Sequence, residues 1–164
     1  MKRTLLLIAF SLVHTLAQAE NWISDELRIR ATLPDPPAWD EFKSSDPNSV
    51  VGRRRPDRSA MITISAKAFP DIPLTEINEE LAKVFMTGAA GPGQEVPPLE
   101  LTSLDGVKTY RASMRPTDRI PAHRTVLVFF NNKHVVAFLL ISTKKPVAEN
   151  AELQTFVRSI RAFK

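Results

Sequence analysis

Two apolar runs near the C-terminal end dominate the hydrophobic pattern of this chain. Residues 124–143 read RTVLVFFNNKHVVAFLLIST, with Asn-Asn-Lys at 131–133 between the runs. Val, Phe, Thr and Ile favour strands, and a polar, Asn-rich group between two such runs favours a tight reversal. The pattern therefore predicts an antiparallel hairpin. Residues 126–130 are all apolar, which is typical of a central strand covered on both faces.

Other segments show the alternation of strands. Met61–Ala68 is the clearest, with apolar residues at its even-numbered positions and Thr63, Ser65 and Lys67 between them. Leu27–Thr32 alternates in the same way. Leu99–Leu104 and Val107–Arg115 flank Asp105-Gly106, so they predict a second hairpin in which Tyr110, Ala112 and Met114 face the core. Val50 and Val51 are expected to start a short edge strand.

Two segments have helical spacing. Thr75–Met86 is expected to be an amphipathic helix capped by Thr75, with Ile77, Leu81, Val84 and Phe85 on one face. Asn150 is expected to cap a final helix whose apolar stripe is Leu153, Phe156, Val157, Ile160 and Phe163. Prolines and polar residues predict loops at 34–59, 88–98 and 116–123.

The first nineteen residues have the layout of a secretory signal peptide. Lys2 and Arg3 precede an apolar run over 5–13, and Ala17-Gln18-Ala19 has small residues where signal peptidase cleaves. The alternative is an uncleaved anchor, but the run is short for a membrane span. We expect cleavage after Ala19, which leaves residues 20–164 as one globular domain.

Composition refines the expected compartment. The chain has no Cys, so an exported protein of this kind relies on its core and not on disulfides, which suggests the bacterial periplasm. The formal net charge of +4 falls by two when Lys2 and Arg3 are removed. This small charge and the export signal together disfavour nucleic acid as a partner.

No motif in the sequence indicates catalysis, a metal or a cofactor. His123 and His134 are the histidines beyond the signal segment, and neither has the spacing of a metal site. We expect His134 to be a solvated turn residue. No Ser lies in a Gly-x-Ser-x-Gly elbow or a Ser-x-x-Lys pair with a suitable context. The sequence thus predicts a protein that is not an enzyme and binds no cofactor.

Arginines and two aromatic residues are the candidate partner-binding residues. Guanidinium groups bind carboxylates and phosphates through planar, bidentate contacts. One set of arginines lies in a polar segment that follows the two aromatic residues. The aromatic side chains are expected to pin a proline-rich loop to the core; the alternative is an exposed stacking platform. A second set follows the 107–115 strand, beside Arg111 and Arg124. A solvated surface balanced by Asp57 and Asp118 is the other interpretation. The candidates are Trp39, Phe42, Arg53, Arg54, Arg55, Arg58, Arg115 and Arg119.

The order of elements resembles the PsbP-like superfamily, which includes the plant oxygen-evolving extrinsic subunit and bacterial DcrB-like envelope proteins. The resemblance is carried by MITISAKAF, LTEINEELAKVF, the Asp-Gly hairpin, TVLVFFNNKHVVAFLLIST and ELQTFVRSIRAF. It implies an α+β fold in which an antiparallel meander of about five to seven strands is flanked by helices as an α/β/α sandwich. It also implies an accessory, non-catalytic role. The chain is similar in size and export signal to periplasmic immunity proteins against type VI toxins.

Three hypotheses follow. The first is a periplasmic, non-enzymatic protein-binding domain, either an accessory envelope protein or an immunity protein whose partner is a secreted toxin. The second is an envelope protein that binds an anionic small ligand or a lipid through exposed arginines. The third is an unrecognised hydrolase, which requires a buried His123 or His134 hydrogen-bonded to a Ser and an acid in one cleft.

Overall fold

The computed structural model describes residues 19–69, 76–91 and 95–163. Its helices are α1 (Glu79–Ala90), a 3-10 turn η1 (Val147–Glu149) and α2 (Ala151–Ser159). Its strands are β1 (Glu20–Ser24), β2 (Ile29–Leu33), β3 (Asp40–Glu41), β4 (Ser49–Arg54), β5 (Ala60–Ala68), β6 (Glu100–Leu104), β7 (Val107–Met114), β8 (His123–Asn131), β9 (His134–Ser142) and β10 (Arg161–Ala162). The α+β fold predicted from the sequence is confirmed.

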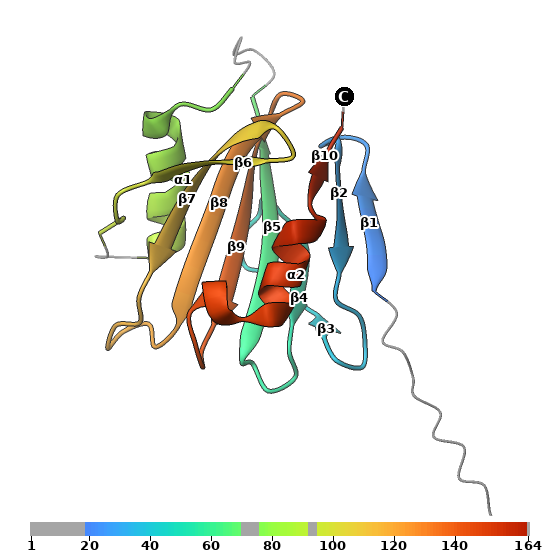
Figure 1. The fold of residues 1–164 in the computed structure, drawn as a ribbon, viewed down its shortest axis with the longest axis vertical. Helices are drawn as coiled ribbons and strands as arrows, with labels where there is room; N and C mark the ends of the chain where they lie inside the picture. Colours follow the sequence, from blue (N-terminus) through green and yellow to red (C-terminus); the bar gives the residue numbers. More distant parts are fainter. Residues whose placement is uncertain (1–18, 70–75, 92–94, 164) are drawn as a thin grey trace, which may run out of the picture.

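The strands form two antiparallel sheets. The larger has seven strands in the order β3-β4-β5-β9-β8-β7-β6, and the smaller has three in the order β1-β2-β10. In Figure 1 the large sheet runs across the molecule, with α1 against one face and α2 and the small sheet against the other. The predicted central hairpin is β8–β9, which reverses at Asn132 and Lys133, both at positive φ. It lies in the middle of the large sheet, as the apolar runs predict.

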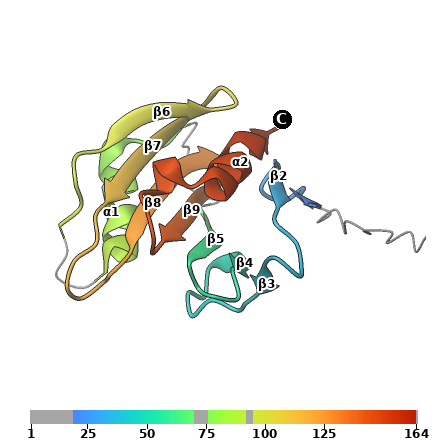
Figure 2. The same ribbon diagram turned by 60° about the horizontal axis from the view of Figure 1, so that its bottom comes forward.

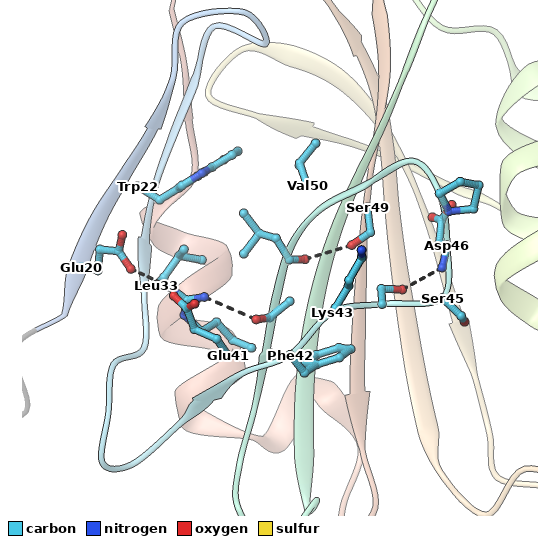
Figure 3. A pocket seen from close by; sticks show the side chains of 15 residues that line it. Glu20, Trp22, Leu33, Glu41, Phe42, Lys43, Ser45, Asp46, Ser49 and Val50 are labelled. Atoms are coloured by element: carbon cyan, nitrogen blue, oxygen red, sulfur yellow. Dashed lines mark hydrogen bonds and ion pairs between the residues drawn. The ribbon is translucent and has the colours of Figure 1, made fainter.

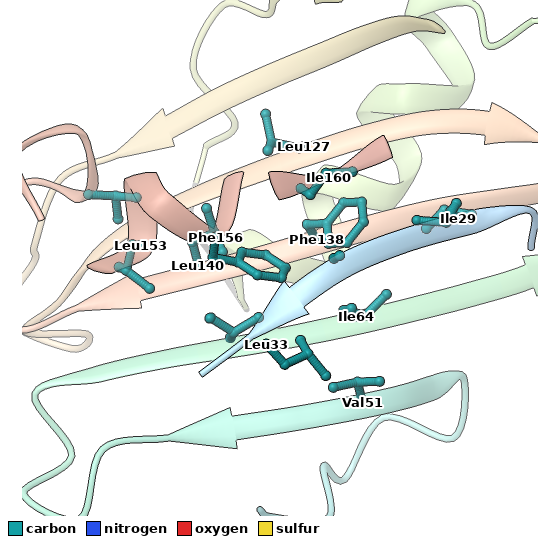
Figure 4. Packing of buried hydrophobic residues seen from close by; sticks show 14 of the residues in the cluster. Ile29, Leu33, Val51, Ile64, Leu127, Phe138, Leu140, Leu153, Phe156 and Ile160 are labelled. Carbon is teal, nitrogen blue, oxygen red and sulfur yellow. The ribbon is translucent and has the colours of Figure 1, made fainter. Parts of the chain in front are cut away.

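Each face of the large sheet buries its own apolar cluster. Under α2 and β2, Phe138 stacks on Phe129 with ring centroids 5.6 Å apart and meets Phe156 of α2 edge-on at 5.8 Å. Figure 4 shows this cluster filling the space between α2, β2 and the large sheet. On the opposite face, Val126 and Val128 pack with Met86 of α1 in a second cluster. Because β8 serves both clusters, it is apolar on both sides.

The second predicted hairpin is also present, as β6–β7 with its turn at Asp105-Gly106. Tyr110, Ala112 and Met114 are buried in the α1-side cluster, as expected. The strand expected at Val50 and Val51 is longer than predicted, since β4 extends to Arg54 and is covered at its outer edge by β3. Residues 53 and 54 therefore lie in a strand, and assigning them to a loop was wrong.

Both helix boundaries differ from the sequence prediction. α1 begins at Glu79 because Asn78 caps it, accepting a hydrogen bond from the backbone N–H of Leu81 at 2.8 Å; the predicted cap, Thr75, lies outside the described residues. The helix continues through Gly88 to Ala90, so the start of the predicted 88–98 loop was wrong. α2 ends at Ser159, and the last part of the predicted stripe is not helical.

A tertiary contact accounts for the early end of α2. Arg161 and Ala162 form β10, which pairs antiparallel with Arg30 and Ile29 of β2. The backbone N–H of Phe163 also donates to the carbonyl of Arg28 at 3.0 Å. Apolar spacing continues past Ser159, but the edge of β2 offers unpaired backbone groups that a strand satisfies and a helix does not.

Candidate functional site

The arginines that the sequence singles out are distributed over separate parts of the fold. Arg53 is buried, and its guanidinium lies 2.6 Å from the Glu20 carboxylate and 2.8 Å from that of Glu41. Arg55 pairs with Glu152 of α2 at 2.6 Å and lies 3.8 Å from Asp57. These pairs tie β1, β3 and α2 to the β4 region. Arg53 and Arg55 therefore have internal carboxylate partners.

The two aromatic candidates have different surroundings. Trp39 is only 2% exposed and belongs to the α2-side cluster, so the expectation that it pins the proline loop to the core agrees with its position. Phe42 is half-buried. Its ring lies against Gly52, and the Arg54 guanidinium stands 5.7 Å above the ring centroid, within cation–π range.

A cleft of about 680 Å³ opens between the small sheet and β4, and we call it the inter-sheet cleft. Figure 3 shows Trp22 and Val50 on opposite sides of it, with Glu20 and Glu41 on the side nearer the small sheet. Arg53 also lines the cleft and is already paired with both of those glutamates. The charged groups on this side of the cleft thus form an internal ion-pair network.

The remaining arginine candidates are exposed at one end of the large sheet. Arg58 lies in the β4–β5 turn, and Arg115 and Arg119 lie in the β7–β8 loop. The strand register brings these connections to the same end, because Ala60 and His123 both pair with Ser142. Both connections lie at the lower edge of the large sheet in Figure 1. An open cleft of about 700 Å³ that includes Glu95 and Asp118 adjoins Arg115 and Arg119.

The other two arginines considered with that set have structural contacts. Arg111 of β7 pairs with Glu100 of β6 at 2.7 Å. Arg124 is 3% exposed and donates hydrogen bonds to the carbonyls of Ala89 and Ala90 at the C-terminus of α1. Burial lowers the pKa of Arg124. Because Arg124 is buried, the shared face that the sequence suggests for Arg111, Arg115, Arg119 and Arg124 does not include all four side chains.

The largest of the described cavities lies beside α1 and was not predicted. It has a volume of about 1030 Å³, and we call it the α1 groove. Its floor consists of Thr63 and Ser65 of β5, Ala137 and Leu139 of β9, and Val126 of β8. These five side chains share one face of neighbouring strands, since Thr63 pairs with Leu139 and Ser65 with Ala137. In Figure 2, α1 covers β7 and β8 and leaves β5 to one side.

The helix wall of the groove is apolar. α1 buries Ala82, Met86 and Ala90 against the sheet, which is its core stripe. A second stripe faces the groove at helical spacing, and its members are Leu81, Val84, Phe85, Gly88 and Ala89. Val84 is 68% exposed. The sequence predicts Leu81, Val84 and Phe85 on the apolar face of an amphipathic helix, and in the structure these three side chains line the groove.

The opposite wall of the groove is the 42–48 segment. The two lysines in the groove lining, Lys43 and Lys67, lie beside aromatic side chains. The Lys67 ammonium stands 5.6 Å from the centroid of Phe69, and Phe69 meets Phe85 edge-on at 6.2 Å. At the other aromatic wall, Arg54 stands over Phe42. Lys43 is exposed beside Phe42.

Asp46 is the acidic residue in this lining. Its carboxylate accepts hydrogen bonds from the Ser65 hydroxyl at 2.6 Å and the Asn48 backbone N–H at 2.9 Å. Desolvation by burial raises the pKa of Asp46, but these hydrogen bonds outweigh it and the net pKa is lowered. Asp46 is therefore an ionised group occupied with fastening the 42–48 segment to β5.

The histidines do not have the contacts of a hydrolase site. His134 was expected to be solvated, but its side chain is only 13% exposed. Its Nε2 lies 3.3 Å from Glu26 and its Nδ1 2.8 Å from the carbonyl of Asn132. His123 opens β8 at the far end of the sheet, so the two histidines lie at opposite ends of one strand pair. Within the described ranges, no three His, Cys, Asp or Glu side chains are grouped as metal ligands.

No family model and no curated protein matches the chain. Among solved structures it is similar to cyanobacterial PsbP (CyanoP) from Synechocystis sp. PCC 6803, with a TM-score of 0.67 and 16% identity over 92% of this chain and 96% of that one. It is also similar to a protein from Bacteroides thetaiotaomicron, with a TM-score of 0.53 and 14% identity over 90% of this chain.

These likenesses concern the fold. The chain spans about half the length of the Bacteroides protein, since it covers 49% of it, but it matches CyanoP almost end to end. No helix among the described residues is both long and apolar enough to cross a membrane. Two antiparallel sheets, two helices and the near-complete superposition on CyanoP together confirm the resemblance seen in the sequence: the chain has a PsbP-like fold.

Proposed function

We propose that this protein is an exported, non-catalytic binding protein of the bacterial envelope, and that its ligand occupies the α1 groove. The observation that carries the proposal is the groove itself. An apolar helix stripe stands open to a sheet floor of Val126, Ala137, Leu139, Thr63 and Ser65 across about 1030 Å³, at the upper end of the range of ligand pockets. A monomeric domain ordinarily covers such a surface, so an apolar partner explains it.

The position of Glu20 supports export with cleavage after Ala19. Glu20 is the first residue of β1, and its side chain pairs with the buried Arg53. Cleavage at this point removes the predicted signal segment and leaves that ion pair intact, whereas cleavage further along would remove it. Mass spectrometry of the protein recovered from the periplasm of a bacterial host is expected to give Glu20 as the N-terminal residue. A mass that retains residues 1–19 would contradict the proposal.

Binding at the groove is tested with a neutral naphthylamine fluorophore that brightens in apolar sites. We expect saturable binding by the wild-type protein and its loss in Gly88→Phe. Gly88 faces the groove from α1, and a Cβ placed there has no atom within 4 Å, so the new ring enters the groove without disturbing the core. Gly88→Ala is the matched control, because it adds one methyl group and leaves the groove open. A fluorophore that binds wild type and Gly88→Phe alike would contradict the assignment of the site.

A protein partner is the second candidate, in the form of an envelope protein or of a secreted toxin to which this protein gives immunity. Arg58, Arg115 and Arg119 favour it, since they are exposed at one end of the sheet and suit an acidic protein surface. A pull-down from periplasmic extract is expected to recover a stoichiometric partner that Arg115→Ser/Arg119→Ser no longer retains. A toxin gene beside this one would favour immunity, and an isolated gene would favour the accessory role.

A further inference from the structure

We infer that the α1 groove binds a long-chain fatty carboxylate, with the acyl chain along α1 and the carboxylate beside Lys67. This inference rests on the proposed function and names the chemical class of the ligand. The floor of the groove, the length of its helix wall and the charges at its rim each point to this class.

The floor disfavours an extended peptide. β5 pairs with β9 along its whole length on one side and with β4 from Met61 to Ser65 on the other, and β9 pairs with β8. Over these residues the backbone groups beneath the groove are already hydrogen-bonded, so that part of the floor has no open strand edge. An extended peptide in the groove would bury its own N–H and C=O groups without partners, which is costly. An acyl chain has no such groups.

The helix wall has the length of one acyl chain. The groove-facing stripe of α1 runs from Leu81 to Ala89, which corresponds to about 14 Å along the helix axis. The acyl chains of one membrane leaflet span about 15 Å, half of a hydrocarbon core about 30 Å thick. The apolar stripe of α1 continues from Leu81 to Ala89, so a single chain laid along it contacts apolar side chains throughout.

The rim of the groove complements a negative headgroup. Lys67, Lys43 and Arg54 are cations at or beside its walls, and Asp46 is the acid, with its carboxylate already hydrogen-bonded to Ser65 and Asn48. Lys67 is the best-placed anchor because it belongs to the nine-residue strand β5 and stands over Phe69, where the apolar wall begins. A carboxylate there gains a charge-assisted contact while its chain enters the groove.

The test is displacement of the neutral naphthylamine fluorophore by palmitate, below the concentration at which palmitate forms micelles. We expect palmitate to displace the fluorophore from wild type. Lys67→Gln should lower the affinity for palmitate about tenfold, which corresponds to the loss of one charge-assisted hydrogen bond. Binding of the fluorophore itself should stay unchanged in Lys67→Gln. Lys145→Gln is the matched control, since it removes one exposed charge outside the groove lining.

The outcomes separate this inference from the proposed function. If the fluorophore does not bind wild type, the proposed function fails. If it binds but palmitate does not displace it, or an amphipathic helical peptide displaces it and palmitate does not, the proposed function stands and the fatty carboxylate is wrong. Equal competition by palmitate and by the alcohol of the same chain length, with no effect of Lys67→Gln, would overturn the headgroup assignment.

Discussion

The guanidinium of Arg53 lies 2.6 Å from the carboxylate of Glu20, so a buried cation in β4 is neutralised by the first residue of β1. The Arg53 side chain is 7% exposed, whereas the side chains of Glu20 and Glu41 are 48% and 73% exposed. The buried partner therefore depends on two accessible acids. This network holds the edge of the small sheet against β3 and β4.

Removing the acids is expected to destabilise the protein through Arg53. Glu20→Gln should lower the free energy of unfolding by about 1 kcal/mol, because Glu41 still pairs with the buried guanidinium. Glu20→Gln/Glu41→Gln should lower it by about 2 kcal/mol, because the buried charge then has neither carboxylate. Urea unfolding measures both free energies. Glu149→Gln, an exposed acid on η1, is the control and should stay within about 0.5 kcal/mol. A double variant that is destabilised no more than the Glu149→Gln control would contradict the network.

Truncations in the central hairpin should distinguish its two faces. Phe129 is 1% exposed and stacks on Phe138, so Phe129→Ala is expected to cost about 3–5 kcal/mol. Leu139 lines the α1 groove and is only half-buried, so Leu139→Ala should cost about 1 kcal/mol or less. Chemical denaturation of both variants checks the difference. Similar costs for the two would mean that the groove is closed over Leu139.

Leu139 also illustrates what the sequence predicts and what it leaves out. From the apolar runs alone, Phe129 and Leu139 are equivalent core positions of a two-faced hairpin, and the fold class and strand order near β8–β9 follow from that pattern. Their difference depends on where α1 lies. α1 covers β7 and β8 but leaves β9 and β5 beside it open, and no local pattern in the chain specifies this placement.

The candidate arginines show a second limit. Clustering in sequence suggests that Arg53, Arg54, Arg55 and Arg58 share one loop, but residues adjacent in a strand point to opposite faces. Arg53 points inward to Glu20, and Arg54 stacks over Phe42. Arg53 pairs with Glu20, which is 33 residues away, and Arg55 pairs with Glu152, which is 97 residues away. Local composition does not predict such distant carboxylate partners. Exposure of Arg58, Arg115 and Arg119 is the part of the prediction that agrees with the structure.

Acid stability should depend on Asp57 in the β4–β5 turn. Hydrogen bonds from the Ser59 hydroxyl and backbone N–H, followed by the Lys144 ammonium, hold the pKa of Asp57 well below its usual range. A carboxyl whose pKa is depressed on folding stabilises the protein above its unfolded pKa and loses that contribution as pH falls toward the folded pKa. The contribution is thus full at neutral pH and declines below about pH 4.

Asp57→Asn removes this titration. We expect the variant to be less stable than wild type at pH 7 and the difference to shrink as the pH is lowered below about 4. Thermal unfolding across that range measures it. Asp105→Asn is the control in the other hairpin turn, because Asp105 is exposed at positive φ and Asn tolerates that conformation. A constant difference between wild type and Asp57→Asn at every pH would exclude the hydrogen-bonded carboxylate as its cause.

The C-terminus of α1 should depend on Arg124. This buried side chain donates from β8 to the carbonyls of Ala89 and Ala90, in a helix whose last turn has no basic residue of its own. Carbonyls at a helix C-terminus have no intrahelical donors, so Arg124→Met leaves them without this partner and should cost about 2–3 kcal/mol. Arg111→Met, at a half-exposed pair with Glu100, is the matched control and should cost less than about 1 kcal/mol.

Hydrogen exchange locates the effect of Arg124→Met. The amides of the last turn of α1 should lose protection before those of its first turn, where Asn78 still caps the helix. Because Ala89 lines the α1 groove, Arg124→Met should also weaken binding of the neutral fluorophore, whereas Arg111→Met should leave that binding unchanged. Uniform loss of protection along α1 would assign Arg124 to general core stability. Unchanged protection at Ala89 and Ala90 would show that the helix end does not need it.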